Sequence, residues 1–290
     1  QKLRKMTGAG LADCKKALVE AEGNMDKAIE IVRERGLAIA AKRSDRATSN
    51  GCILTKKVAG FAAMVGVKCE TDFVAAGKDF VAMVQEILDM ALANHCKTMD
   101  EVKQLKLASG DTAELAVKHR SGITGEHMEL DGYNFIEGDD VSVYDHMNKH
   151  LLCTMVQTNK PAEEQAHAVA MQVAAMSPKY VSRDEVDQDF LEHEKEILLA
   201  QAKKENPEKP ENIIEKMIIG RLNKELKEIC LLDQVYVQDS DLTVAKYVEK
   251  VAKENGANMT VKRFVRFETG EGLEKKNEDF AAEVAAQMNA

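Results

Sequence analysis

A chain of 290 residues has room for one large domain or for two to three small ones. Its formal net charge of −9 argues against a protein that coats nucleic acid, since such a protein needs clustered basic residues to displace counterions. Hydrophobic residues make up 44% of the chain, whereas aromatic residues make up 4% and Trp is absent, which excludes base-stacking and sugar-binding aromatic surfaces. No apolar run approaches the ~18–20 residues that cross a bilayer, so we expect a soluble globular protein.

Six cysteines are spread along the chain without a CxxC pair. A secreted disulfide framework would be denser and a zinc site more closely spaced, so the pattern predicts buried thiols in a reducing compartment. They are Cys14, Cys52, Cys69, Cys96, Cys153 and Cys230. We find no signal or transit peptide and expect a bacterial cytoplasmic location, with a mature organellar form left open. Because the chain opens at Gln1 without Met, a short N-terminal piece is expected to be missing.

Residues 1–47 are predicted to form three short helices. Glycine-containing breaks separate them, and Asn24 is placed as the N-cap of the third helix, with Gly36 as its C-cap. This segment holds eleven Lys and Arg against seven Asp and Glu, a balance of +4 in an acidic chain. The contrast favours a detachable binding module, and a helical cap packed on the main body is the alternative.

Residues 38–50 are predicted to be a solvated linker, after which two similar units of strands and helices follow. The order predicts an α+β fold and not a parallel βαβ sheet. In the first unit the expected elements are strands over 52–58 and 61–70, a helix over 78–93, and short helices with capping boxes at Thr98/Glu101 and Asp111/Glu114. In the second unit we expect a strand over 127–136, a hairpin formed by 141–144 and 150–157, and a helix over 161–176. Further along the chain we expect strands over 234–237 and 261–268, with a helix over 242–254 between them, and a last helix over 279–287.

An inserted segment interrupts the second unit. A capping box is expected at Ser182 and Glu185, and a break at 206–210 separates two charged helical stretches. Each stretch carries a narrow apolar stripe, which is typical of a two-helix antiparallel coiled coil. The predicted seams are Val186, Phe190, Ile197 and Ala200 in the first helix, and Ile214, Ile218, Leu222, Leu226 and Ile229 in the second.

Sites for covalent chemistry are not evident in the sequence. No phosphate-binding GxxxxGK[ST] loop is present, and the GxG fragments at 8–10 and 270–272 lack a third glycine. His146 and His150 flank a predicted turn and do not share a helix face, so they do not form a metal-binding HExxH pair. His95 and Cys96 are adjacent, which is poor geometry for a nucleophile and its base. The sequence therefore favours a binding protein over an enzyme, without a cofactor or metal of its own.

Three separated motifs resemble the elongation factor Ts family, the guanine-nucleotide exchange factors of the GTPase elongation factor Tu. They are the residues 7–10 followed by 13–18, the Thr71-Asp72-Phe73-Val74-Ala75 run after a strand, and the residues 266–272 followed by 279–285. Their order agrees with that family, and the resemblance covers essentially the whole chain. Three motifs in one order are more specific than any of them alone.

The resemblance implies an α+β fold with an inserted hairpin. The implied domains are a three-helix module like ubiquitin-associated domains over 1–47, a first α+β core subdomain over 48–106, a second over 107–182 that continues over 231–290 with a C-terminal helix, and an antiparallel coiled-coil hairpin over 183–230. Residues 107–138 align poorly with the family.

The resemblance also implies a mechanism by contact. Thr71, Asp72, Phe73 and Val74 would form an exposed tip, and Phe73 would enter between helices of elongation factor Tu, displace Mg²⁺ and release GDP. An aromatic residue at a strand-to-helix turn would otherwise be read as core. Secondary contacts are implied at Leu11 and Ala12, where many relatives have two Met, and at Gln172, where many have His.

Two interpretations remain for this chain. As an exchange factor it would bind elongation factor Tu, either one-to-one or as a dimer of heterodimers, and would touch neither nucleic acid nor membrane. As a non-catalytic adaptor it would bind ubiquitin-like folds through residues 1–47 and tether partners through the coiled coil, without any effect on nucleotide. A Cys-dependent hydrolase is a distant third.

Overall fold

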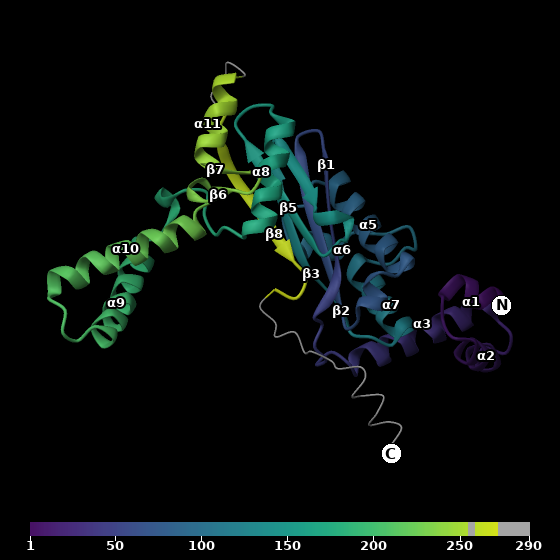
Figure 1. The fold of residues 1–290 in the computed structure, drawn as a ribbon. Coiled ribbons are helices and arrows are strands. Elements are labelled where there is room, and N and C mark those ends of the chain that lie inside the picture. Colours follow the sequence, from purple (N-terminus) through teal and green to yellow (C-terminus); the bar gives the residue numbers. More distant parts are fainter. Residues whose placement is uncertain (255–258, 272–290) are drawn as a thin grey trace. The chain divides into compact units, whose positions relative to one another are not determined.

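A computed structural model describes residues 1–254 and 259–271 (Figure 1). It divides into two compact units. Among the described residues, unit 1 comprises Gln1–Leu54, Met64–Tyr133 and residues 267–271, and unit 2 comprises Thr55–Ala63 and the described part of Asn134–Arg266. Helices and strands are both abundant, in agreement with the predicted α+β class. The helix expected over 279–287 lies outside the described residues.

The elements follow the predicted order closely. The helices are α1 (Lys2–Thr7), α2 (Leu11–Glu20), α3 (Met25–Ala41), α4 (Asp72–Ala75), α5 (Lys78–Ala93), α6 (Met99–Gln104), α7 (Ala113–Thr124), α8 (Glu163–Met176), α9 (Gln188–Glu205), α10 (Glu211–Ile229) and α11 (Val244–Glu254). The strands are β1 (Asn50–Val58), β2 (Phe61–Cys69), β3 (Met128–Glu137), β4 (Val141–Asp145), β5 (Leu152–Thr158), β6 (Val235–Tyr236), β7 (Asp239–Thr243) and β8 (Val261–Glu268). In the described part of the chain, no helix is both long and apolar enough to cross a membrane.

The first three helices pack around a small apolar core in unit 1. Its buried members are Leu3, Ala9, Cys14, Ala17, Ala21, Ala28 and Val32. The predicted N-cap is confirmed, since the Asn24 side chain accepts a hydrogen bond from the Lys27 N–H at 3.1 Å. The predicted C-cap at Gly36 is wrong, because α3 continues to Ala41 and shortens the expected linker.

Gly36 lies inside α3 where that helix crosses α7, and Gly122 is the glycine that this crossing requires. The backbones of α3 and α7 approach so closely that a Cβ placed on Gly122 would lie 2.3 Å from the Cα of Gly36. Small residues at such a crossing let two helix axes come together, because no side chain separates them. A glycine in a helical sequence pattern carries no sign of which role it plays, and here the close approach decides it.

β1, β2 and β3 form one sheet in this order. The Ala59-Gly60 turn joins β1 to β2 as predicted, and Gly60 adopts a φ of 72° that favours glycine. The strand expected over 127–136 is present as β3 and pairs with β2. Helix α5 is present as predicted and buries an apolar face that includes Phe80, Val84, Ile87 and Ala91.

Phe267, at the end of β8, is held by two glycines of unit 1. A Cβ on Gly132 in β3 would lie 1.9 Å from a carbon of the Phe267 ring, and one on Gly66 in β2 would lie 2.4 Å from it. The ring therefore occupies space that any side chain at these positions would fill. The motif at 266–272 thus contains a residue, Phe267, that packs within unit 1.

Two short helices of unit 1 begin at threonine caps. The capping box of Thr98 and Glu101 is formed at α6, as predicted. At α7 the N-cap is Thr112, one residue after the predicted Asp111. The carboxylate of Asp111 is engaged elsewhere, since it accepts a hydrogen bond from His119 at 3.0 Å and lies 3.6 Å from the Arg33 guanidinium.

In unit 2, β4, β5 and β8 form a second sheet in this order. β4 and β5 are antiparallel, with Val141 opposite Gln157 and Asp145 opposite Cys153, so the predicted hairpin is confirmed. Helix α8 contacts both strands, and β6 pairs with β7 in a small separate ribbon. The core of this unit includes Val156, Val169, Val173, Leu231 and Val248.

Helices α9 and α10 of unit 2 pack against each other as a hairpin (Figure 1). Ile214, Ile218, Leu222 and Leu226 are buried on α10, as predicted. The seam predicted on α9 is partly wrong, because Ile197 and Ala200 are exposed and Leu198 and Ala202 face α10 instead. Ser182 and Glu185 make no capping box, because the Glu185 carboxylate accepts from the Val181 N–H, and α9 starts later, at Gln188 with Asp187 as its cap.

Candidate functional site

The predicted Thr71–Val74 tip lies where β2 ends in unit 1. Thr71 is the N-cap of the one-turn helix α4, and its side chain accepts a hydrogen bond from the Val74 N–H at 3.3 Å. Threonine is favoured at this position because its hydroxyl accepts a hydrogen bond from an N–H group of the first turn, which has no acceptor within the helix. The turn carries the next two side chains, Asp72 and Phe73, outward into solvent.

Phe73 is 86% exposed, whereas Phe80 on the following helix is 2% exposed. An exposed phenyl ring contributes little to folding, and its apolar surface is open to contact with a partner. Among the described residues, the Asp72 carboxylate makes no hydrogen bond or ion pair, so it is available to a partner. The tip is thus exposed, as the family resemblance implied, and its backbone is held by hydrogen bonds.

Cys69, the last residue of β2, is hydrogen-bonded to the backbone of the tip. Its thiol donates to the Thr71 carbonyl oxygen, with the sulfur 3.2 Å from that oxygen. Burial, together with the negative charge of Glu126, raises the pKa of the Cys69 thiol to about 12. The thiol is therefore protonated at neutral pH and acts as a donor, not as a nucleophile.

All six cysteines are buried, which gives a direct test of their reactivity. We expect a thiol-specific reagent such as dithiobisnitrobenzoate to react slowly with the native chain at pH 8, and with six thiols once the chain is denatured. The raised pKa of Cys69 also predicts that its contribution to stability, complete below about pH 8.5, is lost as the pH rises towards 12. Rapid labelling of Cys69 in the native chain would contradict its burial and restore a thiol-based activity.

Leu11 and Ala12 also belong to unit 1. They open α2 directly after Gly10, and both are exposed, Leu11 by 63%. The helix places them on its outer side, whereas its inner side buries Cys14 and Ala17. Leu11 is therefore accessible to a partner.

Gln172 of unit 2 is not placed as predicted. Its side chain is fully buried in α8, where the amide donates to the Val235 carbonyl oxygen at 3.0 Å and accepts from the Val237 N–H at 2.8 Å. The same amide donates to the side chain of Gln234 at 3.2 Å. Gln172 thus holds the segment that exposes Val235 and Val237 and cannot itself touch a partner in this structure. Its position on an Ala-rich helix gave no sign of this backbone pairing.

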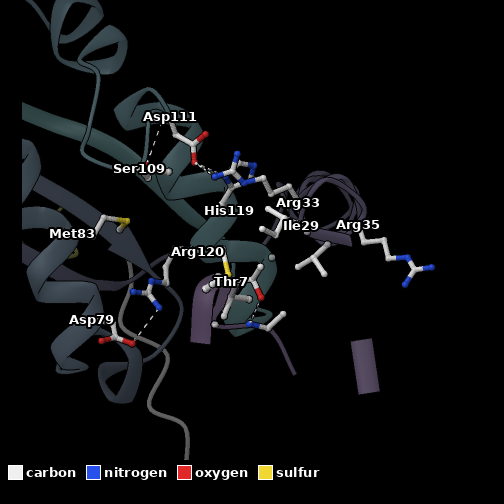
Figure 2. A pocket seen from close by; sticks show the side chains of 18 of the residues that line it. Thr7, Ile29, Arg33, Arg35, Asp79, Met83, Ser109, Asp111, His119 and Arg120 are labelled. Atoms are coloured by element: carbon white, nitrogen blue, oxygen red, sulfur yellow. Dashed lines mark hydrogen bonds and ion pairs between the residues drawn. The ribbon is translucent and has the colours of Figure 1, made fainter. Parts of the chain in front are cut away.

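A cleft of about 750 Å³ in unit 1 is lined by α1, α3, α5 and α7 (Figure 2). Figure 2 shows Arg33 and His119 directed towards Asp111, and Arg120 towards Asp79. The Arg120 and Asp79 groups approach to 3.5 Å. The Asp111 carboxylate links Arg33 of α3 to His119 of α7, and the pair of Arg120 and Asp79 links α7 to α5. The cleft therefore lies where the first three helices meet the rest of unit 1.

The loop between β4 and β5 in unit 2 has an unusual backbone. Met147, Asn148 and His150 have positive φ angles of 56°, 53° and 59°. The Asp145 carboxylate stabilises this shape by accepting from the backbone N–H and the ring Nδ1 of His150. Within the described ranges, no cluster of three or more His, Cys, Asp or Glu side chains is arranged to hold a metal ion.

The family model described as elongation factor TS matches residues 70–271, a span that includes the exposed tip and the packed Phe267. The chain belongs to the elongation factor Ts family. It is 42% identical to the elongation factor Ts of Phocaeicola vulgatus, over 92% of this chain and 96% of that protein. It is 43% identical to those of Clostridium botulinum strain Alaska E43 and Clostridioides difficile strain 630, in both cases over 99% of this chain and 97% of the relative.

Sequence reasoning missed one residue at the tip of this elongation factor Ts family member. Glu126, at the junction of α7 and β3, lies beside Thr71 and accepts hydrogen bonds from it. The two residues are 55 positions apart, and Glu126 falls in the segment that aligned poorly with the family. Its proximity to Thr71 depends on the pairing of β3 with β2, which no local pattern specifies.

Proposed function

We propose that this chain is a guanine-nucleotide exchange factor that accelerates the release of GDP from elongation factor Tu. The observation that carries the proposal is the 86% exposure of Phe73 on a turn whose backbone is held by hydrogen bonds. A rigid, exposed aromatic residue can enter a partner at low entropic cost, because it needs no ordering on binding. Membership of the elongation factor Ts family supports the same partner and role.

In the proposed mechanism the Phe73 ring enters between helices of the GTPase near its bound Mg²⁺. That metal ion is the largest counter-charge to the GDP phosphates, so its displacement weakens nucleotide binding. Asp72 would act by shifting hydrogen bonds at the same place. Exchange factor and nucleotide then oppose each other, and linkage requires that each weakens the binding of the other by the same factor. No bond is made or broken by this chain, so we regard it as a non-enzymatic factor without a cofactor.

The remaining surfaces have proposed supporting roles. We infer that α1–α3 act as a module like ubiquitin-associated domains, with Leu11 and Ala12 at its contact surface. We interpret α9 and α10 as a coiled coil whose seam serves its own packing. Gln172 would act indirectly, by holding Val235 and Val237 in place. The bacterial relatives support an action in the bacterial cytoplasm.

The proposal is tested by loading elongation factor Tu of the same organism with a fluorescent GDP analogue. Addition of the full chain, in the presence of excess unlabelled GDP, is expected to accelerate the loss of fluorescence in proportion to its concentration. Unlabelled GDP alone is the control. An unchanged release rate, with binding of the chain to its partner demonstrated, would favour the adaptor interpretation.

The same assay in excess EDTA isolates the metal step. If the chain acts by displacing Mg²⁺, the acceleration it gives should shrink once the metal has already been removed. An acceleration of equal factor with and without Mg²⁺ would show that the chain acts on the nucleotide by another route.

A further inference from the structure

We propose that Glu126 is a positioning residue for the Phe73 tip, and that its carboxylate fixes the direction in which the ring points. This inference rests on the proposed function, because a fixed direction is useful only if Phe73 enters a partner. Phe73 itself cannot supply the rigidity, since its ring is exposed and α4 consists of four residues. A helical segment of this length is not stable by itself in water. The restraint must therefore come from the residues on either side.

Thr71 is the residue through which the restraint acts. Its hydroxyl donates to Oε1 of Glu126 at 2.6 Å, and its backbone N–H donates to Oε2 at 3.1 Å. One carboxylate thus binds both donors of the residue that precedes Asp72 and Phe73. Hydrogen bonds to an ionised acceptor are shorter and stronger than those between neutral groups.

The acceptor atoms of Thr71 are occupied as well. Its hydroxyl oxygen accepts from the Val74 N–H, and its carbonyl oxygen accepts from the Ala75 N–H at 3.2 Å and from the Cys69 thiol. Every polar atom of Thr71 therefore has a partner, and rotation of the tip about this residue would break several hydrogen bonds together. The contacts from Val74 and Ala75 belong to the tip itself, so Glu126 and Cys69 provide the attachment to the rest of unit 1.

Glu126 is itself firmly placed. Helix α7 ends at Gly125, whose φ of 78° turns the chain, and the Ser121 hydroxyl donates to the Glu126 carbonyl oxygen. A second carboxylate makes the converse contact: Glu70, which precedes Thr71, accepts a hydrogen bond from the N–H of His127, which follows Glu126, at 2.6 Å. The pairs 70–71 and 126–127 thus bind each other reciprocally, each through one carboxylate and one backbone N–H. Such an arrangement fixes the junction in both position and angle.

The first test needs no partner. Because the chain has no Trp, Phe73→Trp introduces a single indole that reports on the tip alone. Time-resolved fluorescence anisotropy should show a slow decay that follows the tumbling of the protein. Adding Glu126→Ala is expected to create a fast nanosecond component, the range of loop motion. Glu126→Gln keeps one acceptor oxygen and should give a smaller change in the same direction.

Glu101→Ala is the matched control. The Glu101 carboxylate also accepts two backbone N–H groups beside a threonine N-cap, that of Thr98 at α6, but it is not in contact with the tip. This variant should leave the anisotropy decay of the indole unchanged. The inference is overturned if Glu126→Ala also leaves it unchanged, or if Glu101→Ala changes it equally.

The second test measures GDP release in a double-mutant cycle. Glu126→Ala is expected to lower the maximal exchange rate by about tenfold, since a mobile tip spends only a fraction of its time in the productive direction. In the Phe73→Ala background the same change should cost less than about twofold, because no ring remains to be directed. Equal losses in both backgrounds would overturn the inference. If the unsubstituted chain does not accelerate GDP release from elongation factor Tu, the proposed function is refuted. The anisotropy result would still decide whether Glu126 restrains the tip.

Discussion

Phe73→Ala is expected to reduce the rate of GDP release by roughly ten- to a hundredfold. Burying a phenyl ring in a partner is worth about 1.5–3 kcal/mol, and the ring is the largest apolar group at the tip. The same substitution should change the free energy of unfolding by less than about 0.5 kcal/mol, because the ring is 86% exposed and leaves no cavity. Stopped-flow release of a fluorescent GDP analogue and denaturant unfolding measure the two quantities.

Phe80→Ala provides the contrast on the neighbouring helix. Its ring is 2% exposed, so truncation should cost about 3–5 kcal/mol of unfolding free energy. Exchange by the fraction that remains folded should be nearly normal. If Phe73→Ala were to cost as much stability as Phe80→Ala, the Phe73 ring would be part of the core and its proposed entry into elongation factor Tu would be wrong.

Gly122→Ala is expected to loosen the packing of the first three helices on the rest of unit 1. The added methyl group would lie 2.3 Å from the Cα and 2.5 Å from the carbonyl oxygen of Gly36, both backbone atoms that cannot rotate away. Helices α3 and α7 must separate to admit it, and overpacking of this kind costs about 1–3 kcal/mol. Thermal unfolding should show the loss, and trypsin should cut faster after Lys42, Arg43 and Arg46, which follow α3.

Gly36→Ala makes the same chemical change on the opposite helix. Its methyl group would meet the Cα of Gly122 at 3.6 Å, an ordinary van der Waals distance, and no other described atom beyond the backbone of its own helix lies within 4 Å. Replacement of a glycine inside a helix should then stabilise the chain by about 0.5–1 kcal/mol. If the two variants unfold alike, the close crossing of α3 and α7 is not as the structure has it.

Local signals in the sequence predicted much of the fold. The hairpin of β4 and β5, the helix α5, the capping box of α6 and the seam of α10 were all found, because each depends on residues close together in the sequence. The exposed tip was found differently. An aromatic residue after a strand is usually buried, and only the family motif around Phe73 pointed to exposure.

Three of the failures share one physical cause, which is that they depend on contacts distant in sequence. Gly36 lies inside α3 where that helix crosses α7, and the amide of the buried Gln172 is satisfied by the backbone at Val235 and Val237. Glu126 could not be assigned to the tip without knowing that β3 lies beside β2. Polar and glycine residues take their roles from the groups that tertiary folding brings to them.

Helix α7 has a consequence for how a partner is chosen. At Gly122 it fastens the helices that carry Leu11, and its end leads to Glu126, which restrains Phe73. The two proposed anchors of unit 1 are then joined by a stiff spacer and not by a flexible tether. Once one anchor is bound, the other is presented at high effective concentration, but only to a surface whose two pockets have the matching separation. Avidity and selectivity would thus arise from one structural element that touches neither pocket.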